Sequence, residues 1–322
     1  MSIAHAPAKV IITGEHFVVH GQPALAAAVN LYSKVSVETG SPGIVEISSS
    51  ELGISARFEA GQMGSFEVDE RRMLEPLMLV VEEVLDRAGE RRLGLRLRIE
   101  SEIPVGVGLG SSASTAVSTA AAVAELLGLK LTREQIRELA SIQEQSIHKK
   151  PSGIDAHVTT YGGVVLFKLG KQPSHLQPTD DVRIIIGNTG ATRSTGDLVS
   201  RVGHRIQMGD TDLMRISEAA GQITLQAVEA YVKRDFQQLG RLMDENHELL
   251  RQAGVSTSQL DSLVEAARDA GALGAKLTGA GGGGCMIALC RPEEADQVSK
   301  AVEAAGGRSY SVTVDKAGVR IG

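Results

Sequence analysis

The sequence predicts a mixed α/β protein with two domains, and three observations support this. The chain has 322 residues, enough for two medium domains, and its 42% hydrophobic and 22% charged residues are ordinary for a globular protein. Residues 95–100 have strand periodicity and lead through a glycine-rich loop into a helix-forming stretch. Residues 173–181 are polar and rich in turn formers. We therefore expect one domain over residues 1–175 and a second over residues 176–322.

The charge and cysteine content argue against several classes of protein. A net charge of −6 disfavours nucleic acid or an anionic membrane as the main partner, and the absence of Trp disfavours a base-stacking surface. No apolar run reaches the roughly 18 residues that a membrane-spanning helix needs, and no secretory signal is visible. Cys285 and Cys290 fall on opposite faces of a predicted strand and should not bridge. Two free thiols are typical of the cytoplasm.

The elements expected in the N-terminal half follow from apolar periodicity and turn residues. Residues 32–38 and 45–50 should be antiparallel neighbours joined by a turn at 41–43. The other expected elements are a strand at 10–13, an apolar stretch at 24–29, a helix at 73–88, a strand at 95–100, and helices at 115–127 and 133–149.

Residues 104–114 have the features of a phosphate-binding loop. Gly106, Gly108 and Gly110 permit φ > 0 and carry no side chain that would hold a ligand away from the backbone. The helix that follows presents unpaired N–H groups and the positive end of its dipole at the same place. The pattern is neither G-x-x-x-x-G-K-[ST] nor G-x-G-x-x-G. The loop consists of Pro104, Val105, Gly106, Val107, Gly108, Leu109, Gly110, Ser111, Ser112, Ala113 and Ser114.

Four polar residues outside this loop have both a structural and a functional interpretation. Lys9, just before the first strand, is either solvated or near a phosphate, and His16 lies in either a structural turn or a loop that presents its imidazole. Glu144 falls near the apolar stripe of its helix, so it either reaches solvent or binds a metal. Asp155 follows a glycine turn and is either a helix N-cap or a carboxylate at a loop tip.

The C-terminal half contains a second glycine loop. Residues 279–284 match G-x-G-x-x-G, but a strand-like run at 285–289 follows instead of a helix, which argues against a dinucleotide-binding dehydrogenase. Residues 187–195 are rich in hydroxyls and glycine, and Arg193 there is suited to face an anionic substrate. The remaining expected elements are strands at 182–186 and 309–314 and helices at 197–208, 213–233, 236–252, 258–270 and 292–305.

Together these residues suit phosphoryl transfer from a nucleotide. That reaction needs backbone donors around the phosphates, Mg²⁺ with oxygen ligands, and a carboxylate near the attacking hydroxyl. The two glycine loops, the hydroxyls of Ser111 and Ser112, Lys9 and the carboxylates of Glu144 and Asp155 supply such groups.

At the level of motifs the chain resembles the GHMP kinases. Residues 104–113 are similar to the central motif of this family and residues 276–285 to its C-terminal motif. Residues 6–9 and 14–21, together with 151–155, 193–195 and 246–247, are most similar to the branch of the family that phosphorylates mevalonate. The matches extend over residues 6–285 in the same order as in the family.

The resemblance implies an N-terminal domain like ribosomal protein S5 domain 2, a ferredoxin-like α+β C-terminal domain, and a site between them. It implies ATP-dependent phosphorylation of the C5 hydroxyl of mevalonate in isoprenoid biosynthesis, with Mg²⁺ as cofactor. Asp155 would take the hydroxyl proton and Lys9 would offset the phosphoryl charge. Ser112 and Glu144 would bind Mg²⁺. The implied substrate contacts are Lys9, His16, Arg193 and Thr195, and the implied phosphate contacts are residues 104–114 with Gly281 and Gly282, supported by Thr278.

Other functions stay open at this level. Phe17 stands where the family commonly has a small residue, which leaves room for a related acceptor. An acceptor that already carries a phosphate, as for a phosphomevalonate kinase, would need more cations in the cleft than Arg193 offers. A non-catalytic sensor on the same fold would be expected to have lost Lys9, Asp155 or the metal ligands. A homodimer is compatible with the sequence but is not specified by it.

Overall fold

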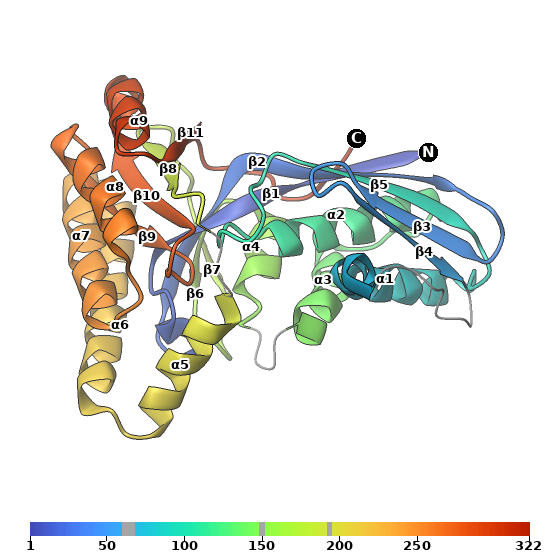
Figure 1. Ribbon diagram of the computed structural model, residues 1–322, viewed down its shortest axis with the longest axis horizontal. Helices are drawn as coiled ribbons and strands as arrows, with labels where there is room; N and C mark the ends of the chain where they lie inside the picture. Colours follow the sequence, from blue (N-terminus) through green and yellow to red (C-terminus); the bar gives the residue numbers. More distant parts are fainter. Residues whose placement is uncertain (60–67, 148–151, 192–194) are drawn as a thin grey trace.

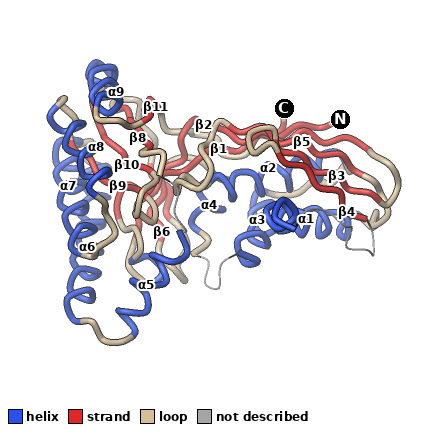
Figure 2. The backbone as a smooth tube through the Cα atoms, viewed as in Figure 1, coloured by secondary structure: helices blue, strands red, loops and turns tan. Residues whose placement is uncertain are grey.

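The computed structural model describes residues 1–59, 68–147, 152–191 and 195–322, with the backbone alone for 68–72, 147 and 195–197. Two sheets organise the described chain, and helices pack against each of them (Figures 1 and 2). The first sheet has eight strands, and all but the last, β12, come from the N-terminal half. They are β1 (Ser2–Thr13), β2 (Ala24–Thr39), β3 (Ile44–Ser49), β4 (Ile54–Glu59), β5 (Leu95–Ser101), β6 (Val164–Phe167), β7 (Ser174–Leu176) and β12 (Arg320–Ile321).

The first sheet is covered on one face by four helices (Figure 1). Its order is β12-β1-β2-β5-β3-β4, and β6 also pairs with β2 and β7. The helices are α1 (Val68–Ala88), α2 (Ser111–Leu126), α3 (Arg133–Ile147) and α4 (Ile154–Tyr161). α2 lies against β1 and β2 and is flanked by α1 and α3. Its ten buried residues are all small, seven alanine or valine and three serine or threonine, which lets the neighbouring backbones approach closely.

The second sheet has the order β11-β8-β10-β9 and is antiparallel throughout. Its strands are β8 (Arg183–Asn188), β9 (Gly274–Thr278), β10 (Cys285–Cys290) and β11 (Arg308–Val312). The helices of this half are α5 (Thr195–Gln207), α6 (Thr211–Val232), α7 (Phe236–Gln252), α8 (Ser258–Asp269) and α9 (Ala295–Ala304), and two single turns complete the described elements, η1 (Phe17–His20) and η2 (Pro292–Glu294).

Helix α7 packs very closely on β9 because both carry glycine at the crossing. A Cβ added at Gly240 would lie 2.1 Å from the carbonyl oxygen of Leu273, and one at Gly274 would lie 2.0 Å from the carbonyl oxygen of Gly240. Any side chain there would separate the helix from the strand. This contact fixes the two buried polar residues of α7, Asn246 and His247, next to β9.

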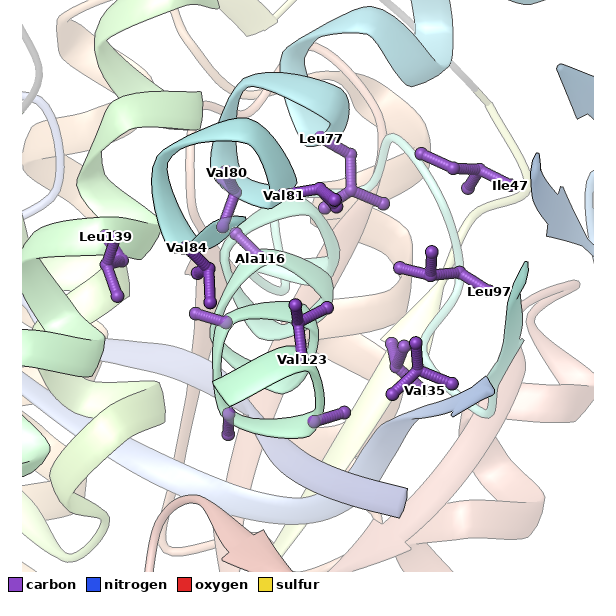
Figure 3. Close-up of a cluster of buried hydrophobic side chains, with 14 of the residues drawn as sticks. Val35, Ile47, Leu77, Val80, Val81, Val84, Leu97, Ala116, Val123 and Leu139 are labelled. Atoms are coloured by element: carbon purple, nitrogen blue, oxygen red, sulfur yellow. The ribbon is translucent and has the colours of Figure 1, made fainter. Parts of the chain in front are cut away.

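Four buried apolar clusters occur in the described chain, and one of them joins the two sheets. The N-terminal cluster lies between the first sheet and α1, α2 and α3 (Figure 3). A second cluster combines β1 residues Val10 and Ile12 with Leu109 of the glycine loop and with Ile186 and Ile287 of the second sheet. Because this cluster contains residues of both sheets, apolar packing holds the two sheets together. The boundary predicted at residue 175 stays a prediction; β7 of the first sheet ends at Leu176, β8 begins at Arg183, and β12 returns to the first sheet.

The predicted pairing of residues 32–38 with 45–50 is wrong. Both segments are strands, but β5 lies between them, antiparallel to β2 and parallel to β3. Gly94 lets β5 enter this position, because a Cβ there would lie 1.7 Å from the carbonyl oxygen of Ser41. The apolar face of β5 packs on the helices and outweighs the local preference of the 41–43 turn for a hairpin.

Leu97 tests the N-terminal cluster. Its side chain is fully buried between the first sheet and the helices, so Leu97→Ala should lower the free energy of unfolding by about 2–5 kcal/mol through lost burial and a residual cavity (Figure 3). Arg98→Ala, on the exposed face of the same strand, should change it by less than about 0.5 kcal/mol. Urea denaturation of both variants measures this, and equal losses would contradict the described packing.

Candidate active site

The first glycine loop has the backbone that an anion site needs. Gly106, Gly108 and Gly110 have φ values of 74°, 86° and 76°, the left-handed region that favours glycine. α2 begins at Ser111, four residues earlier than predicted, and no side chain caps its N-terminus. The N–H groups of its first turn therefore have no side-chain acceptor of their own and are suited to an anion.

The side chains of this loop divide into anchors and exposed groups. Val107 and Leu109 are buried, and the Ser114 hydroxyl donates to the Ala6 carbonyl oxygen at 2.6 Å, so these residues hold the loop on the first sheet. Val105 and Ser112 are exposed. Of the predicted phosphate contacts, Ser114 thus has a partner within the protein, whereas the hydroxyl of Ser112 faces outward. Pro104, Ser111 and Ala113 are half-buried.

The second glycine loop approaches the first with backbone against backbone. A Cβ added at Gly279 would lie 3.2 Å from Cα of Gly108, and one at Gly284 would lie 2.9 Å from the carbonyl oxygen of Val107. Gly281 lines a small pocket between the loops, whereas the N–H of Gly282 donates to the Val255 carbonyl oxygen at 2.8 Å. The pocket is lined by Gly106, Val107, Gly108, Ala280, Gly281, Gly283 and Gly284.

Lys9 and Asp155 form an ion pair beside the first loop. Lys9 lies within β1, and its Nζ is 3.1 Å from Oδ1 of Asp155 and donates to the Gly108 carbonyl oxygen, also at 3.1 Å. The Lys9 side chain is 6% exposed and that of Asp155 is 31% exposed, so the carboxylate keeps access to a ligand. The solvated interpretation of Lys9 is wrong, because its side chain is buried and its Nζ is bound within the protein.

The N-cap interpretation of Asp155 is also wrong. Gly153, with φ 77°, is the N-cap of α4, and Asp155 lies in the first turn of the helix. The helix dipole favours a negative charge there, and the lysine beside it adds to that effect. Asp155 is thus a partly exposed carboxylate held between a helix N-terminus and a buried cation.

Glu144 is a largely buried carboxylate next to Asp155. Desolvation, reinforced by the negative charge of Asp155, raises the pKa of Glu144 to about 7. The N–H of Gly153 donates to its Oε1 at 3.4 Å, and its Oε2 is buried without a hydrogen-bond partner in the described part of the chain. The interpretation that Glu144 reaches solvent is therefore wrong. A buried oxygen without a donor is suited to a cation.

These oxygens fit Mg²⁺ as part of a larger coordination shell. Mg²⁺ prefers oxygen ligands and is commonly bound by one or two protein groups together with water and substrate phosphates. Glu144 supplies a carboxylate oxygen, and Ser112 lies in the first turn of α2 at the phosphate loop. Among the described residues, no three His, Cys, Asp or Glu side chains gather into a metal site of their own.

His16 is a buried, neutral imidazole at the second loop. Burial lowers its pKa to about 4. Its Nε2 is 2.9 Å from the Ala280 carbonyl oxygen, which only accepts, so Nε2 carries the proton and Nδ1 is an acceptor. Nδ1 has no partner in the described part of the chain. His16 has a φ of 61°, which is unusual for a residue other than glycine.

Two predicted substrate contacts have no described side chain. Arg193 lies outside the described residues, and Thr195 begins α5 with only its backbone described. Phe17 is fully buried in the apolar cluster of the C-terminal half, with Ile185 and Leu213, and so is a core residue of that half.

The sequence did not predict a set of buried polar contacts that connects the two halves next to the site. The Thr278 hydroxyl accepts from the Ile11 N–H at 2.9 Å and donates to the Ile11 carbonyl oxygen at 3.1 Å. The Asn246 side chain accepts from the Gly14 N–H at 3.2 Å. Lys276 forms an ion pair with Glu15, although it lies in a strand buried along its whole length. A lysine within an apolar strand signals a buried partner, but the sequence does not identify that partner.

His247 supports β9 from α7. Its Nδ1 accepts from the Leu277 N–H at 3.3 Å, and its Nε2 is 3.2 Å from Oδ1 of Asp261. Burial and the charge of Lys276 lower its pKa to about 4, so the ring is neutral and Nε2 donates to Asp261. The backbone of the strand that leads into the second glycine loop is thereby held in place.

Comparison with known proteins identifies the family. Residues 76–163 match the model of the GHMP kinases N-terminal domain, and residues 226–308 match the GHMP kinases C-terminal model. Mevalonate kinase of Thermococcus gammatolerans is 41% identical over 99% of this chain and 98% of that protein. Solved structures of similar fold include L. major mevalonate kinase in complex with R-mevalonate, at 30% identity, with 97% of this chain and 95% of that chain covered and a TM-score of 0.81. Methanococcus jannaschii mevalonate kinase matches at 26% identity, 97% and 98% coverage and a TM-score of 0.86. The protein described here belongs to the GHMP kinase family.

Proposed function

We propose that this protein transfers the γ-phosphoryl group of ATP to the C5 hydroxyl of mevalonate and forms 5-phosphomevalonate, a reaction of isoprenoid biosynthesis. The observation that carries the proposal is the Lys9–Asp155 pair beside the first glycine loop. It occurs in a chain that aligns over nearly its full length with mevalonate kinases. ATP is the phosphoryl donor that the family implies.

The residues of the pair divide the reaction between them. Asp155 accepts the proton of the C5 hydroxyl. At the same time the hydroxyl oxygen bonds to the γ-phosphorus of ATP, and the bond between that phosphorus and the departing ADP breaks. Lys9, fixed by Gly108 and Asp155, places positive charge beside the transferring group. General-base assistance is worth roughly 10²–10⁴-fold, and positioning and electrostatics account for most of the remaining acceleration. Glu144 and Ser112 would hold Mg²⁺, which neutralises phosphate charge when bound.

The charges of the described residues favour mevalonate over an acceptor that already carries a phosphate. Lys9 is paired with Asp155 and Lys276 with Glu15, so neither is an uncompensated cation for a second phosphate. The single carboxylate of mevalonate would need one cation, for which we propose Arg193. We also propose that Nδ1 of His16 accepts a hydrogen bond from the substrate and that Thr195 contributes a further contact.

The remaining expectations about context are proposals of the same kind. In the described part of the chain no helix has the length and apolar character to cross a membrane. Both cysteines are unpaired and buried, and on that basis we place the enzyme in the cytoplasm. The partners that the reaction needs are small molecules, mevalonate and ATP.

The acceptor is tested by the release of ADP from Mg-ATP with mevalonate, 5-phosphomevalonate, homoserine and galactose supplied separately. We expect turnover with mevalonate and at least 100-fold lower kcat/KM with the other three. Turnover with 5-phosphomevalonate instead would contradict the assignment and establish the alternative kinase. Tight Mg-ATP binding without turnover on any acceptor would indicate a sensor.

Asp155→Asn tests the proton acceptor. The amide keeps the shape but cannot take the proton, so kcat should fall by about 10²–10⁴-fold or more while Mg-ATP affinity stays within about threefold. Asp180→Asn is the control, because Asp180 is an exposed carboxylate paired with a different lysine, Lys316. Steady-state kinetics and calorimetric ATP titration measure both effects. A loss in kcat below tenfold would remove Asp155 from this role.

Glu144→Gln tests the buried carboxylate through stability and activity. The pKa of Glu144 rises from 4.5 in the unfolded chain to about 7 in the fold, so the folded state binds the proton more tightly. The stabilising effect of protonation is complete below pH 4.5 and is lost as the pH rises through 7. In metal-free buffer at pH 8 the neutral glutamine should therefore raise the free energy of unfolding by up to about 3 kcal/mol, and by less than about 1 kcal/mol at pH 5.

The control for this prediction is Glu138→Gln on the exposed face of the same helix, which should change stability by less than about 0.5 kcal/mol. Urea denaturation at the two pH values measures the difference, and Mg²⁺-dependent turnover should fall in Glu144→Gln alone. A glutamine variant less stable than the parent at pH 8 would show that the carboxylate has a compensating partner, contrary to the geometry described above.

A further inference from the structure

Three consecutive residues after β1 each contact the C-terminal half. The N–H of Gly14 donates to Asn246, Glu15 pairs with Lys276, and Nε2 of His16 donates to the Ala280 carbonyl oxygen. Lys276 lies in β9, which leads directly into the second glycine loop. The turn after the strand that carries Lys9 is thus attached to the strand that carries the other loop.

The Glu15–Lys276 pair is the most completely buried of the ion pairs between described residues. The side chain of Lys276 is 0% exposed and that of Glu15 is 1% exposed. Removing two charges from water is unfavourable, and an apolar pair of similar volume is often at least as stable. Burial of an ion pair is therefore weak evidence that it stabilises the fold.

The pair is also incompletely satisfied, which argues against a role in stability alone. Nζ of Lys276 donates to Oε1 of Glu15 and to the Leu277 carbonyl oxygen, but Oε2 of Glu15 is buried without a hydrogen-bond partner in the described part of the chain. What an ion pair offers beyond apolar packing is direction, because its hydrogen bonds hold a few atoms in a defined geometry. One of those atoms is the carbonyl oxygen of Leu277, the residue before Thr278.

The alignment that this geometry fixes is that of the two glycine loops. Gly279 and Gly108 touch through their backbones, and Gly284 approaches the Val107 carbonyl oxygen, so a small shift of β9 would change the pocket between them. Apolar packing of β9 would still bury this strand but would tolerate such a shift, since it is not directional.

We propose that Glu15 and Lys276 act as a positioning pair that holds the second glycine loop in register with the first and so shapes the pocket for the phosphates of ATP. The proposal rests on the proposed function in that it takes the two loops as the nucleotide site. Neither residue touches the reacting atoms in this assignment. Both act through the backbone of β9 and of the loop that follows it.

The test separates stability from positioning with the double variant Glu15→Leu/Lys276→Met. Removing both charges avoids leaving either one buried alone, so the melting temperature should stay within a few degrees of the parent. Mg-ATP affinity, measured by calorimetry without any acceptor, should fall at least tenfold, and kcat/KM for ATP should fall with it. KM for mevalonate should change by less than threefold.

Arg320→Met is the matched control. It removes the cation paired with another buried carboxylate, Asp315, at the β1–β12 edge of the first sheet. It should leave Mg-ATP affinity within twofold of the parent, whatever its effect on melting temperature. A double variant with the ATP affinity and kcat/KM of the parent would overturn the proposal.

If the double variant does not fold, the single variant Glu15→Gln tests the proposal instead. The amide preserves the shape of the side chain but weakens its hold on Lys276, so a fivefold or larger loss of Mg-ATP affinity supports positioning and a change below twofold overturns it. Because ATP binding is measured without an acceptor, failure of mevalonate as a substrate leaves this test unaffected.

Discussion

Two glycine-rich backbone segments, one from each half of the chain, come into contact where the two sheets meet. A Cβ at Gly279 or Gly284 would press against the facing loop, and both residues, like Gly108, adopt backbone angles that favour glycine. This approach places residues of both loops around one small pocket. The other features of the site depend on it, because a helix N-terminus alone would leave one side of a phosphate chain unbound.

The charges around this contact are arranged in pairs, with one exception. Lys9 pairs with Asp155 and Lys276 with Glu15, and each pair includes a buried lysine. Glu144 has no cation of its own among the described residues and its pKa is raised to about 7. Such a group destabilises the metal-free fold and becomes useful when a divalent cation approaches. Active sites commonly contain groups that lower the stability of the fold because function requires them.

The two lysines differ in what they hold. Lys9 fixes the first loop through the carbonyl oxygen of Gly108 and remains next to a partly exposed carboxylate, so it can act on a ligand. Lys276 is sealed within the protein and connects the Glu15 carboxylate to the Leu277 carbonyl oxygen of its own strand. His247 and Asn246 extend this support into α7, whose glycine contact with β9 keeps them in place. The site therefore depends on the junction of the halves as much as on either half.

Features that rest on local chemistry could be predicted from the amino-acid sequence. The first glycine loop, the helix after it and the strand before it were predicted, because glycine spacing and apolar alternation act within a few residues. The strand after the second glycine loop was predicted for the same reason, and this correctly argued against a dinucleotide fold. The resemblance to a known family supplied the expected roles of Lys9 and Asp155, whose contact spans 146 positions that no local pattern connects.

Features that depend on residues far apart in the sequence could be seen only in the folded protein. β5 enters between β2 and β3 because its apolar face packs on helices elsewhere in the chain, which no turn signal at 41–43 reveals. The burial that raises the pKa of Glu144 comes from elements on other parts of the sequence. Glu15 and Lys276 are 261 residues apart, and neither residue identifies its partner in the sequence. Burial, and with it the strength of a charge, is a property of the whole packed molecule.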